Sequence, residues 1–325
     1  MATPTAATSE TREHGQGQRM SRQGICVRRA TVLNQSLMKF ISILFLAAAV
    51  SIGASSEPLL DKPSLVSTDW LAERIDHPEI RVVDARSGLG AYIEGHLPGA
   101  IYLNTETVRN SAGGVPARLL PPEQLAELLE KLGIGNDHTV VIYSSSSETF
   151  SHATYVAFLL EWLGHEAIGV LDGGFEKWQA EDRELTDVFS SYERAVFEPD
   201  LVPEILLDTQ EVQTAAANES AALLDARPPQ AFETGRIPTA RSFFLDNTLE
   251  GDEVTTWKSP EQLRALATEA GVSDDEPVIT YCTSGRQSSQ IYFSLRHVAG
   301  LSDVASYEGS WIEWTARETP VESAR

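Results

Sequence analysis

Two stretches of the chain read alike, VVDARSGLGAYIEGHLPGAIYLN (82–104) and LLDARPPQAFETGRIPTARSFFL (223–245). Each begins with an apolar run, passes through Asp-Ala-Arg and continues beyond a turn that contains proline. A second pair follows in the same order, LLPPEQLAELLEKLGIGNDHTVVIYS (119–144) and WKSPEQLRALATEAGVSDDEPVITYC (257–282). A repeat of about 140 residues is too long for a solenoid unit, so the sequence predicts two copies of one domain.

The pattern inside each copy predicts an α/β fold. An apolar strand precedes a helix that opens with Pro-Glu, and a second apolar strand follows that helix. A third matched pair, LDGGFEKWQA (171–180) and YEGSWIEWTA (307–316), reads as a Gly-aromatic turn into a Trp-bearing helix. Short apolar strands that alternate with helices are typical of a parallel sheet flanked by helices on both faces, here of about five strands. The expected strands are 81–83, 139–143, 222–224 and 278–281.

The repeat also predicts the domain boundaries. We place the first domain at residues 60–183 and the second at 207–320. Residues 184–206 lack clear periodicity and carry prolines near their end, which is typical of a linker. Residues 1–56 precede both copies and form an N-terminal extension.

This extension predicts export. Its 56 residues hold six basic and two acidic side chains, and Lys39 is followed by FISILFLAAAVSIGA, an apolar run at about 40–54. A basic flank, a short apolar core and small residues at its end are typical of a secretory signal peptide. The run is shorter than the roughly 20 residues that span a bilayer. We therefore expect a periplasmic or secreted protein without stable membrane insertion after cleavage. A membrane anchor at 40–54 is the alternative, and both Met1 and Met38 are possible starts.

The charge of the chain limits its partners. Lys and Arg number 25 against 47 Asp and Glu, which gives a formal net charge of −22 over 325 residues. Such a balance argues against nucleic acid or an anionic membrane surface as a partner.

The positions of the two cysteines indicate that the second copy carries the reactive residue. Cys26 lies in the extension predicted to be removed, so Cys282 is left as a lone thiol that forms no intramolecular disulfide. A lone thiol in an oxidising compartment is either buried and inert or kept for its reactivity. The repeat places Ser144 at the corresponding position of the first copy, within SSSSETF (144–150). The first copy is therefore predicted to be catalytically silent.

The Cys282 loop, residues 282–287, has the composition of a site for an anionic sulfur. A strand that runs into a tight loop and a helix N-terminus aims backbone N–H groups at one point, which stabilises a thiolate. Gly285 permits a turn that a side chain would obstruct, and Arg286 adds a permanent cation with a forked donor. The candidate catalytic residue is Cys282, and the candidate substrate-binding residues are Thr283, Ser284, Gly285, Arg286 and Gln287. The alternative is an inert, buried cysteine that ends a strand.

Together these motifs resemble the rhodanese sulfurtransferases. The resemblance rests on the tandem repeat, the Asp-Ala-Arg motifs, GHLPGA (95–100), YCTSGRQS (281–288) and the Gly-aromatic-Trp segments, and covers about residues 60–318. It implies a silent first domain and a second domain whose Cys282 accepts a sulfane sulfur as a persulfide. The implied donors are thiosulfate and 3-mercaptopyruvate, and the implied acceptors are cyanide or a thiol, which includes a thiol on a partner protein. No metal or organic cofactor is implied.

The loop favours thiosulfate as the donor. Mercaptopyruvate-using relatives tend toward small, uncharged loops, whereas this loop carries Arg286. One departure weakens the expectation, because Ala231 stands where many two-domain relatives have a further arginine. A 3-mercaptopyruvate sulfurtransferase and a persulfide relay module that serves a protein partner are the alternatives. Phosphatases and arsenate reductases of the same fold use a longer C-x5-R loop, whereas Arg286 is the fourth residue after Cys282.

Several other residues are interpreted as structural. The Asp-Ala-Arg motif recurs in the silent copy, so an ion pair is expected in both copies, although Asp225 and Arg227 are also candidates for bracing the Cys282 loop. Further structural expectations concern His96 as a turn-packing residue, Trp178 and Trp314 as core residues, Trp311 at the border of the pocket, and Asp84 with Arg86 as the first ion pair.

Overall fold

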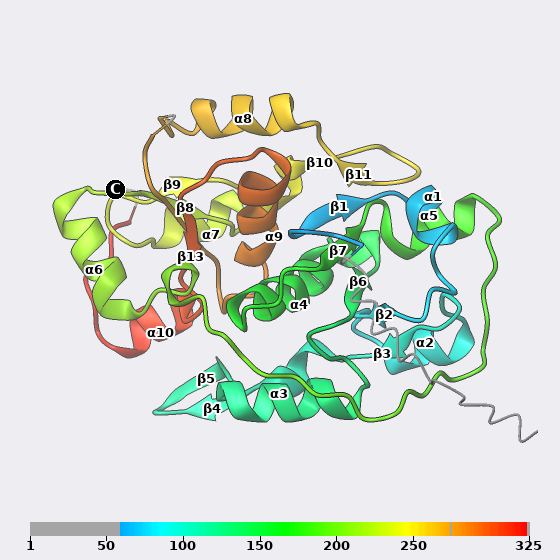
Figure 1. Ribbon diagram of the computed structural model, residues 1–325. Helices are drawn as coiled ribbons and strands as arrows, with labels where there is room; N and C mark the ends of the chain where they lie inside the picture. Colours follow the sequence, from blue (N-terminus) through cyan, green and yellow to red (C-terminus); the bar gives the residue numbers. More distant parts are fainter. Residues whose placement is uncertain (1–58, 274, 324–325) are drawn as a thin grey trace, which may run out of the picture. The chain divides into compact units, whose positions relative to one another are not determined.

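The computed structural model describes residues 59–273 and 275–323 (Figure 1). They belong to one compact unit, Ser55–Arg325. The predictions for the N-terminal extension, including Cys26 and the apolar run at 40–54, lie outside the described residues and stay predictions. Within the described part of the chain, no helix has the length and apolar character needed to cross a membrane.

The first repeat is built on a five-stranded parallel sheet. Its strand order is β1-β7-β6-β2-β3, and every neighbouring pair is parallel. The strands are β1 (Ser64–Val66), β2 (Ile80–Asp84), β3 (Ile101–Tyr102), β6 (Thr139–Tyr143) and β7 (Ile168–Leu171). The helices are α1 (Thr68–Ala72), α2 (Leu89–Glu94), α3 (Pro122–Lys131), α4 (Ser151–Trp162) and α5 (Gly174–Ala180), with the 3₁₀ turns η1 (Thr105–Val108) and η2 (Ser146–Glu148).

Alternating strand residues bury both faces of this sheet. On β6, Val140 and Ile142 pack in one apolar cluster with residues of α3 and α4. Val141 and Tyr143 point the other way and pack with Leu71, Tyr92 and Trp178 of α1, α2 and α5. Since successive side chains of a strand face opposite sides, the continuous apolar run 139–143 indicates a strand that helices cover on both faces.

The second repeat has the same plan with a shorter sheet. Its strand order is β13-β12-β8-β9, again all parallel. The strands are β8 (Ala222–Asp225), β9 (Arg241–Ser242), β12 (Val278–Tyr281) and β13 (Val304–Ser306). The helices are α6 (Thr209–Asn218), α7 (Pro229–Thr234), α8 (Pro260–Glu269), α9 (Ser288–Phe293) and α10 (Ser310–Ala316), with 3₁₀ turns η3 (Pro203–Ile205) and η4 (Leu245–Thr248) and a π-helical turn η5 (Ser294–Val298). The place of β1 is taken by a single parallel bridge between Leu206 and Ser306.

Local sequence explains where the two Pro-Glu helices begin. In α8, Ser259 and Gln262 form a reciprocal capping box, and Pro260 occupies the first turn. Proline suits that turn because its missing N–H would have no partner in the helix. Helix α3 also has proline in its first turn, at Pro122. Each repeat also carries a small antiparallel hairpin, β4 (Arg109–Ala112) with β5 (Val115–Leu119) and β10 (Leu249–Glu250) with β11 (Thr256–Trp257).

The two repeats pack against each other through α4 and α9, which lie side by side (Figure 1). The Thr154 and Ser289 hydroxyls are 2.9 Å apart, and the rings of Phe158 and Tyr292 meet edge to face at 5.0 Å. The segment 187–202 has no helix or strand and runs along the first repeat. It is held there by backbone bonds such as Val202 N–H to Trp162 O at 2.9 Å. Helix α9, which follows the Cys282 loop, therefore lies against α4 of the first repeat.

Candidate active site

Cys282 directly follows β12, and its backbone is anchored on both sides. Its N–H donates to Ser310 Oγ at 3.1 Å, and its carbonyl accepts the N–H of Trp311 at 3.0 Å. Ser310 and Trp311 begin α10, which follows β13. The parallel pairing of β12 with β13 brings this helix start beside the loop. The sulfur position is thus defined by the sheet and the turn into α10.

One backbone amide points at the sulfur. The Gly285 N–H lies 3.2 Å from Cys282 Sγ. Gly285 has φ +89°, and a Cβ placed there would lie 2.4 Å from the Glu308 carbonyl oxygen. Only glycine fits this conformation and this close approach. The glycine therefore allows the loop to fold back so that an amide faces the thiol.

The other loop amides are not used by the protein. Within the described residues, no protein acceptor is found for the backbone N–H groups of Thr283, Ser284, Arg286 and Gln287. Of the expected cradle over 283–287, the structure shows one amide on the sulfur, that of Gly285, and a role for the other amides stays a prediction. Thr283 is exposed, while Ser284 and Gln287 are half-buried.

The Cys282 thiol is buried beneath this loop. Cys282 is 1% exposed and packs in an apolar cluster with neighbours such as Leu224 and Ile291. Burial alone is typical of an inert structural cysteine. The Gly285 amide beside Sγ is the feature that an inert core cysteine does not require. Cys282 Sγ is shielded from solvent in this structure.

Arg286 extends from the loop toward the first repeat. Its Nη1 donates to Glu106 Oε1 at 2.8 Å, and its side chain is 28% exposed. Its Nε is buried and has no hydrogen-bond partner among the residues that the structure describes. Glu106 belongs to η1 of the first repeat. A guanidinium with one edge paired and a buried N–H unpaired is suited to receive a further anionic ligand.

Arg109 of the first repeat is a site residue that the sequence did not reveal. Its Nη1 donates to the Ser284 carbonyl at 3.1 Å, and its Nε and Nη2 bind the Glu106 carboxylate at 2.9 and 2.5 Å. Burial lowers the pKa of Arg109, but the bonds to Glu106 together with the nearby Tyr155, Glu106 and Glu308 outweigh this and raise the pKa above its ordinary value. One sequence signal could have indicated it, which is a difference between the two copies. Strand β4 begins with Arg109, whereas the corresponding strand of the second copy, β10, begins with Leu249.

The buried carboxyl of Glu308 adjoins the same loop. Its carbonyl oxygen faces Gly285, and its Oε1 accepts the Tyr155 hydroxyl of the first repeat at 2.9 Å. Burial raises the pKa of Glu308 to about 7, against a weaker lowering by the bond from Tyr155. This group therefore titrates near neutral pH at the boundary between the repeats.

Glu308 is expected to make stability depend on pH. Because its folded-state pKa lies above the ordinary value of 4.5, the native state binds this proton more tightly than the unfolded state, and the free energy of unfolding falls as pH rises from about 4.5 through 7. The loss is about 3 kcal/mol when complete. In Glu308→Gln, which keeps an acceptor for Tyr155, urea unfolding at pH 5 and pH 8 should lack most of this fall. Glu269→Gln, on the exposed side of α8, should retain it, and an identical pH profile for the parent and Glu308→Gln would contradict the assignment.

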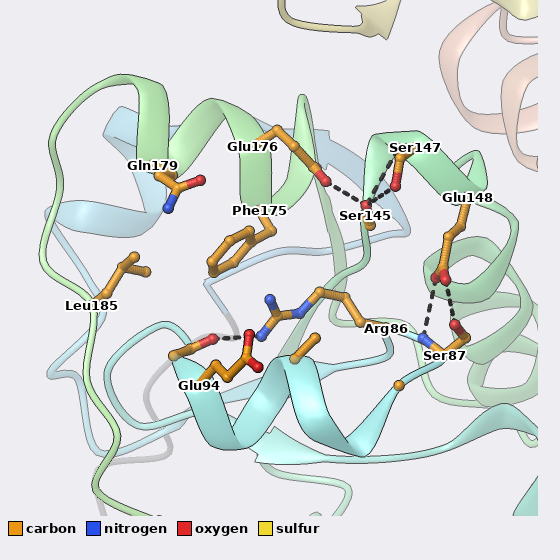
Figure 2. Close-up of a pocket in the computed structure, with 13 residues that line it drawn as sticks. Arg86, Ser87, Glu94, Ser145, Ser147, Glu148, Phe175, Glu176, Gln179 and Leu185 are labelled. Carbon is orange, nitrogen blue, oxygen red and sulfur yellow. Dashed lines mark hydrogen bonds between the residues drawn. The ribbon is translucent and has the colours of Figure 1, made fainter.

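The corresponding loop of the first repeat is already occupied by a carboxylate (Figure 2). Ser144 stands in place of Cys282, and Glu176 of α5 accepts bonds from the Ser146 N–H at 2.8 Å and from the Ser145 hydroxyl. In the matched segments 171–180 and 307–316, Ile312 occupies the position of Glu176. The second copy therefore lacks the internal carboxylate that occupies the loop in the first.

The cavity beside this loop is lined by three carboxylates and one guanidinium group, that of Arg86. It measures about 520 Å³, and Figure 2 shows Glu94, Glu148 and Glu176 around it. Glu148 is itself bonded to the N–H of Ser87 at 3.2 Å. The charge of Arg86 is paired with Asp84 at 2.6 Å. Ser144 offers no sulfur nucleophile, and a catalytically silent first copy stays a prediction.

The two Asp-Ala-Arg motifs form the same buried ion pair in both repeats. Arg227 Nε and Nη2 bind the Asp225 carboxylate, with a shortest distance of 2.5 Å, and Arg86 binds Asp84 at 2.6 Å. Arg227 also lies over the Trp311 ring at 4.4 Å, and the Trp311 N–H donates to the Cys282 carbonyl. The pair is thus a feature of the fold in both copies, and in the second it supports a residue that holds Cys282.

The remaining predicted residues lie as follows. His96 is fully buried and bridges the Tyr92 and Val188 carbonyls at 2.8 and 3.1 Å. Trp178 and Trp314 are buried in the cores, and Ala231 is half-buried on α7. Among the described residues, no group of three or more His, Cys, Asp or Glu side chains is placed to hold a metal ion.

Comparison with known proteins assigns both repeats to one domain family. Residues 67–181 and 208–317 each match the family model of the Rhodanese-like domain. A putative thiosulfate sulfurtransferase of Synechococcus elongatus is 33% identical over 79% of this chain and 84% of its own length. The sulfur carrier protein TtuD of Thermus thermophilus is 32% identical over 77% and 93%. The 3-mercaptopyruvate sulfurtransferase of Escherichia coli K12 is 30% identical over 80% and 98%.

The fold is also similar to a solved structure. The crystal structure of SseA from Escherichia coli, a protein described with 3-mercaptopyruvate sulfotransferases and the rhodanese fold, matches with a TM-score of 0.69. The match has 27% sequence identity and covers 77% of this chain and 99% of that one. The predicted fold class, two tandem parallel sheets with helices, is confirmed.

Proposed function

The chain belongs to the rhodanese family of sulfurtransferases, and we propose that it transfers the outer sulfur of thiosulfate to a thiophilic acceptor through a persulfide on Cys282. The observation that carries the choice of residue is the Gly285 amide, 3.2 Å from Cys282 Sγ. Within the described residues Cys282 is the only cysteine, and the first repeat has Ser144 in its place.

The chemistry takes two displacement steps. The Cys282 thiolate attacks the outer sulfur of thiosulfate, a new S–S bond forms, and the bond to the sulfonate sulfur breaks so that sulfite leaves with the electron pair. The acceptor, cyanide or a thiolate, then attacks the outer persulfide sulfur, and Cys282 leaves as the thiolate. The Gly285 amide supports the negative charge on the Cys282 sulfur before the first step and after the second.

Thiosulfate is favoured by the charges around the loop. Arg286 and Arg109 bring two guanidinium groups to one side of it, and the buried Nε of Arg286 is unpaired. A dianion with three oxygens on its head group gains more from this arrangement than a singly charged carboxylate. Arg109 also supplies, from the other repeat, a cation that Ala231 does not provide.

The donor preference is tested by kinetics on the unmodified protein. The ratio of kcat/KM values for thiosulfate and 3-mercaptopyruvate, with cyanide as acceptor, should exceed about tenfold in favour of thiosulfate, equivalent to about 1.4 kcal/mol. Production of thiocyanate and sulfite is measured for one donor, and thiocyanate and pyruvate for the other. A ratio below one would assign the protein to 3-mercaptopyruvate instead.

A persulfide relay is the second candidate, favoured by similarity to a protein described as a sulfur carrier. In that case the acceptor is a thiol on a partner protein, and turnover with cyanide is slow until the partner is added. The exposed Thr283 side of the loop is the surface that such a partner would meet first. Export of the protein is part of the proposal and rests only on the pattern of residues 39–54.

A further inference from the structure

Glu106 lies between the two arginines of the proposed donor site. Its Oε1 accepts from Arg286 Nη1 at 2.8 Å and from Arg109 Nη2 at 2.5 Å, and its Oε2 accepts from Arg109 Nε at 2.9 Å. One carboxylate thus pairs with two guanidinium groups that come from different repeats, and its single charge offsets only one of theirs.

The Glu106 side chain is held by these two arginines and is otherwise free to move. It is 55% exposed, and within the described residues it makes no other side-chain hydrogen bond. The bonds from Arg109 lower its pKa, with a smaller contribution from the charge of Arg286, so it is a carboxylate at neutral pH. An exposed carboxylate on a short 3₁₀ turn can leave Arg286 at modest cost, because exposed ion pairs contribute little stability.

The Arg286 guanidinium lacks one hydrogen-bond acceptor among the described residues, and a ligand could supply it. Its Nε is buried without a partner, although Glu106 binds its Nη1. A buried N–H without an acceptor is costly and is uncommon in folded proteins. Glu106 therefore pairs only part of the guanidinium, and an anion with several oxygens satisfies it more completely.

In the first repeat a carboxylate binds the corresponding loop directly. There Glu176 binds the loop itself, through the Ser146 amide and the Ser145 hydroxyl, and its side chain comes from within the same repeat. In the second repeat the loop amides are left open, and a carboxylate from the neighbouring repeat pairs with Arg286.

We propose that Glu106 is an internal competitor of the anionic sulfur donor, which must displace its carboxylate from Arg286 before it reaches Cys282. This inference rests on the proposed function in that Cys282 is the sulfur-accepting residue. Glu106 raises the KM of the donor without taking part in sulfur transfer. Its effect acts on anions that approach Cys282 and not on neutral reagents of similar size.

Alkylation of Cys282 tests this independently of any donor. Second-order rates are measured with iodoacetate, an anion, and iodoacetamide, its neutral counterpart, on the parent, on Glu106→Gln and on the control Glu276→Gln. Glu276 pairs with Arg241 at 2.9 Å on the outside of the second repeat. Modification is quantified on the Cys282 peptide by mass spectrometry, because the chain also contains Cys26.

In Glu106→Gln the iodoacetate rate should rise about three- to fivefold while the iodoacetamide rate changes less than twofold. Glu276→Gln should match the parent with both reagents. Equal acceleration of both reagents would show that Glu106 is a steric cover, unchanged rates would show that it does not compete, and slower iodoacetate would show that it aligns the arginines. Each of these three results overturns the proposal.

The kinetic readout is the KM for thiosulfate, which should fall by a similar factor in Glu106→Gln with kcat within about twofold. A KM that stays constant or rises in this variant contradicts the proposal. If the parent protein does not turn over thiosulfate, the proposed function fails, while the alkylation rates still decide the role of Glu106.

Discussion

Replacing Cys282 with serine is expected to lower kcat for sulfur transfer by about 10⁴-fold or more, because the attacking atom itself is removed. The hydroxyl of serine is not ionised near neutral pH, and it does not form the S–S bond on which the first step depends. Intact-mass spectrometry gives a second readout. The parent, incubated with thiosulfate, should gain the mass of one sulfur atom, and Cys282→Ser should not.

The repeat offers a matched control for this variant. Ser144 occupies the position of Cys282 in the first copy and is equally buried, so Ser144→Ala should retain the parent activity. The double variant Cys282→Ser with Ser144→Cys should remain inactive, because Glu176 already binds the Ser146 amide of that loop. Persulfide formation on Cys282→Ser at the parent level would show that another thiol carries the sulfur.

Replacing Arg286 with alanine is expected to lower kcat/KM for thiosulfate by about 10²-fold, most of it through KM. The variant removes one of the two guanidinium groups beside the loop, and it leaves Glu106 paired with Arg109 alone. Arg286→Lys keeps the charge but loses the fork, so it should recover only part of the loss. The measurement is the kcat/KM value for both donors in each variant.

The matched control for Arg286 is Arg241→Ala, which removes another arginine of the second repeat that pairs with a glutamate. Its kcat/KM for thiosulfate should stay within about twofold of the parent. For 3-mercaptopyruvate, the loss in Arg286→Ala should be several-fold smaller than for thiosulfate. An equal loss for both donors would contradict the idea that this arginine selects between them.

Periodicity and repetition predicted much of the fold. The strand 278–281 is β12 as predicted, and 139–143 is β6, while 222–224 extends by one residue to Asp225. The prediction of about five strands describes the first sheet, but it was one too many for the second, where a single bridge at Leu206 replaces an edge strand. Edge strands are weakly signalled because only one side of them pairs, so their length depends on the surrounding contacts.

The candidate site was predicted only in part. A strand that ends at Cys282, a glycine three residues on and an arginine after it are local features, visible because backbone conformation follows from neighbouring residues. The turn at Gly285, with φ +89°, is one that a sequence pattern can indicate. Glu106, Arg109 and Tyr155 were missed, because the residues next to them in the chain do not indicate that they lie beside the Cys282 loop in the fold.

The sequence by itself determined that this protein is a duplicated α/β domain of the rhodanese family, because the repeats and the apolar strands are patterns of consecutive residues. It also predicted, from the cysteine loop, that the chemistry belongs to the second copy. Only the tertiary structure decided what surrounds that loop. Arg109 and Ser284 are 175 residues apart, and their contact depends on how α4 and α9 pack. Electrostatic interactions act through space between side chains, so the charges that govern access to Cys282 come from the fold as a whole and not from the loop.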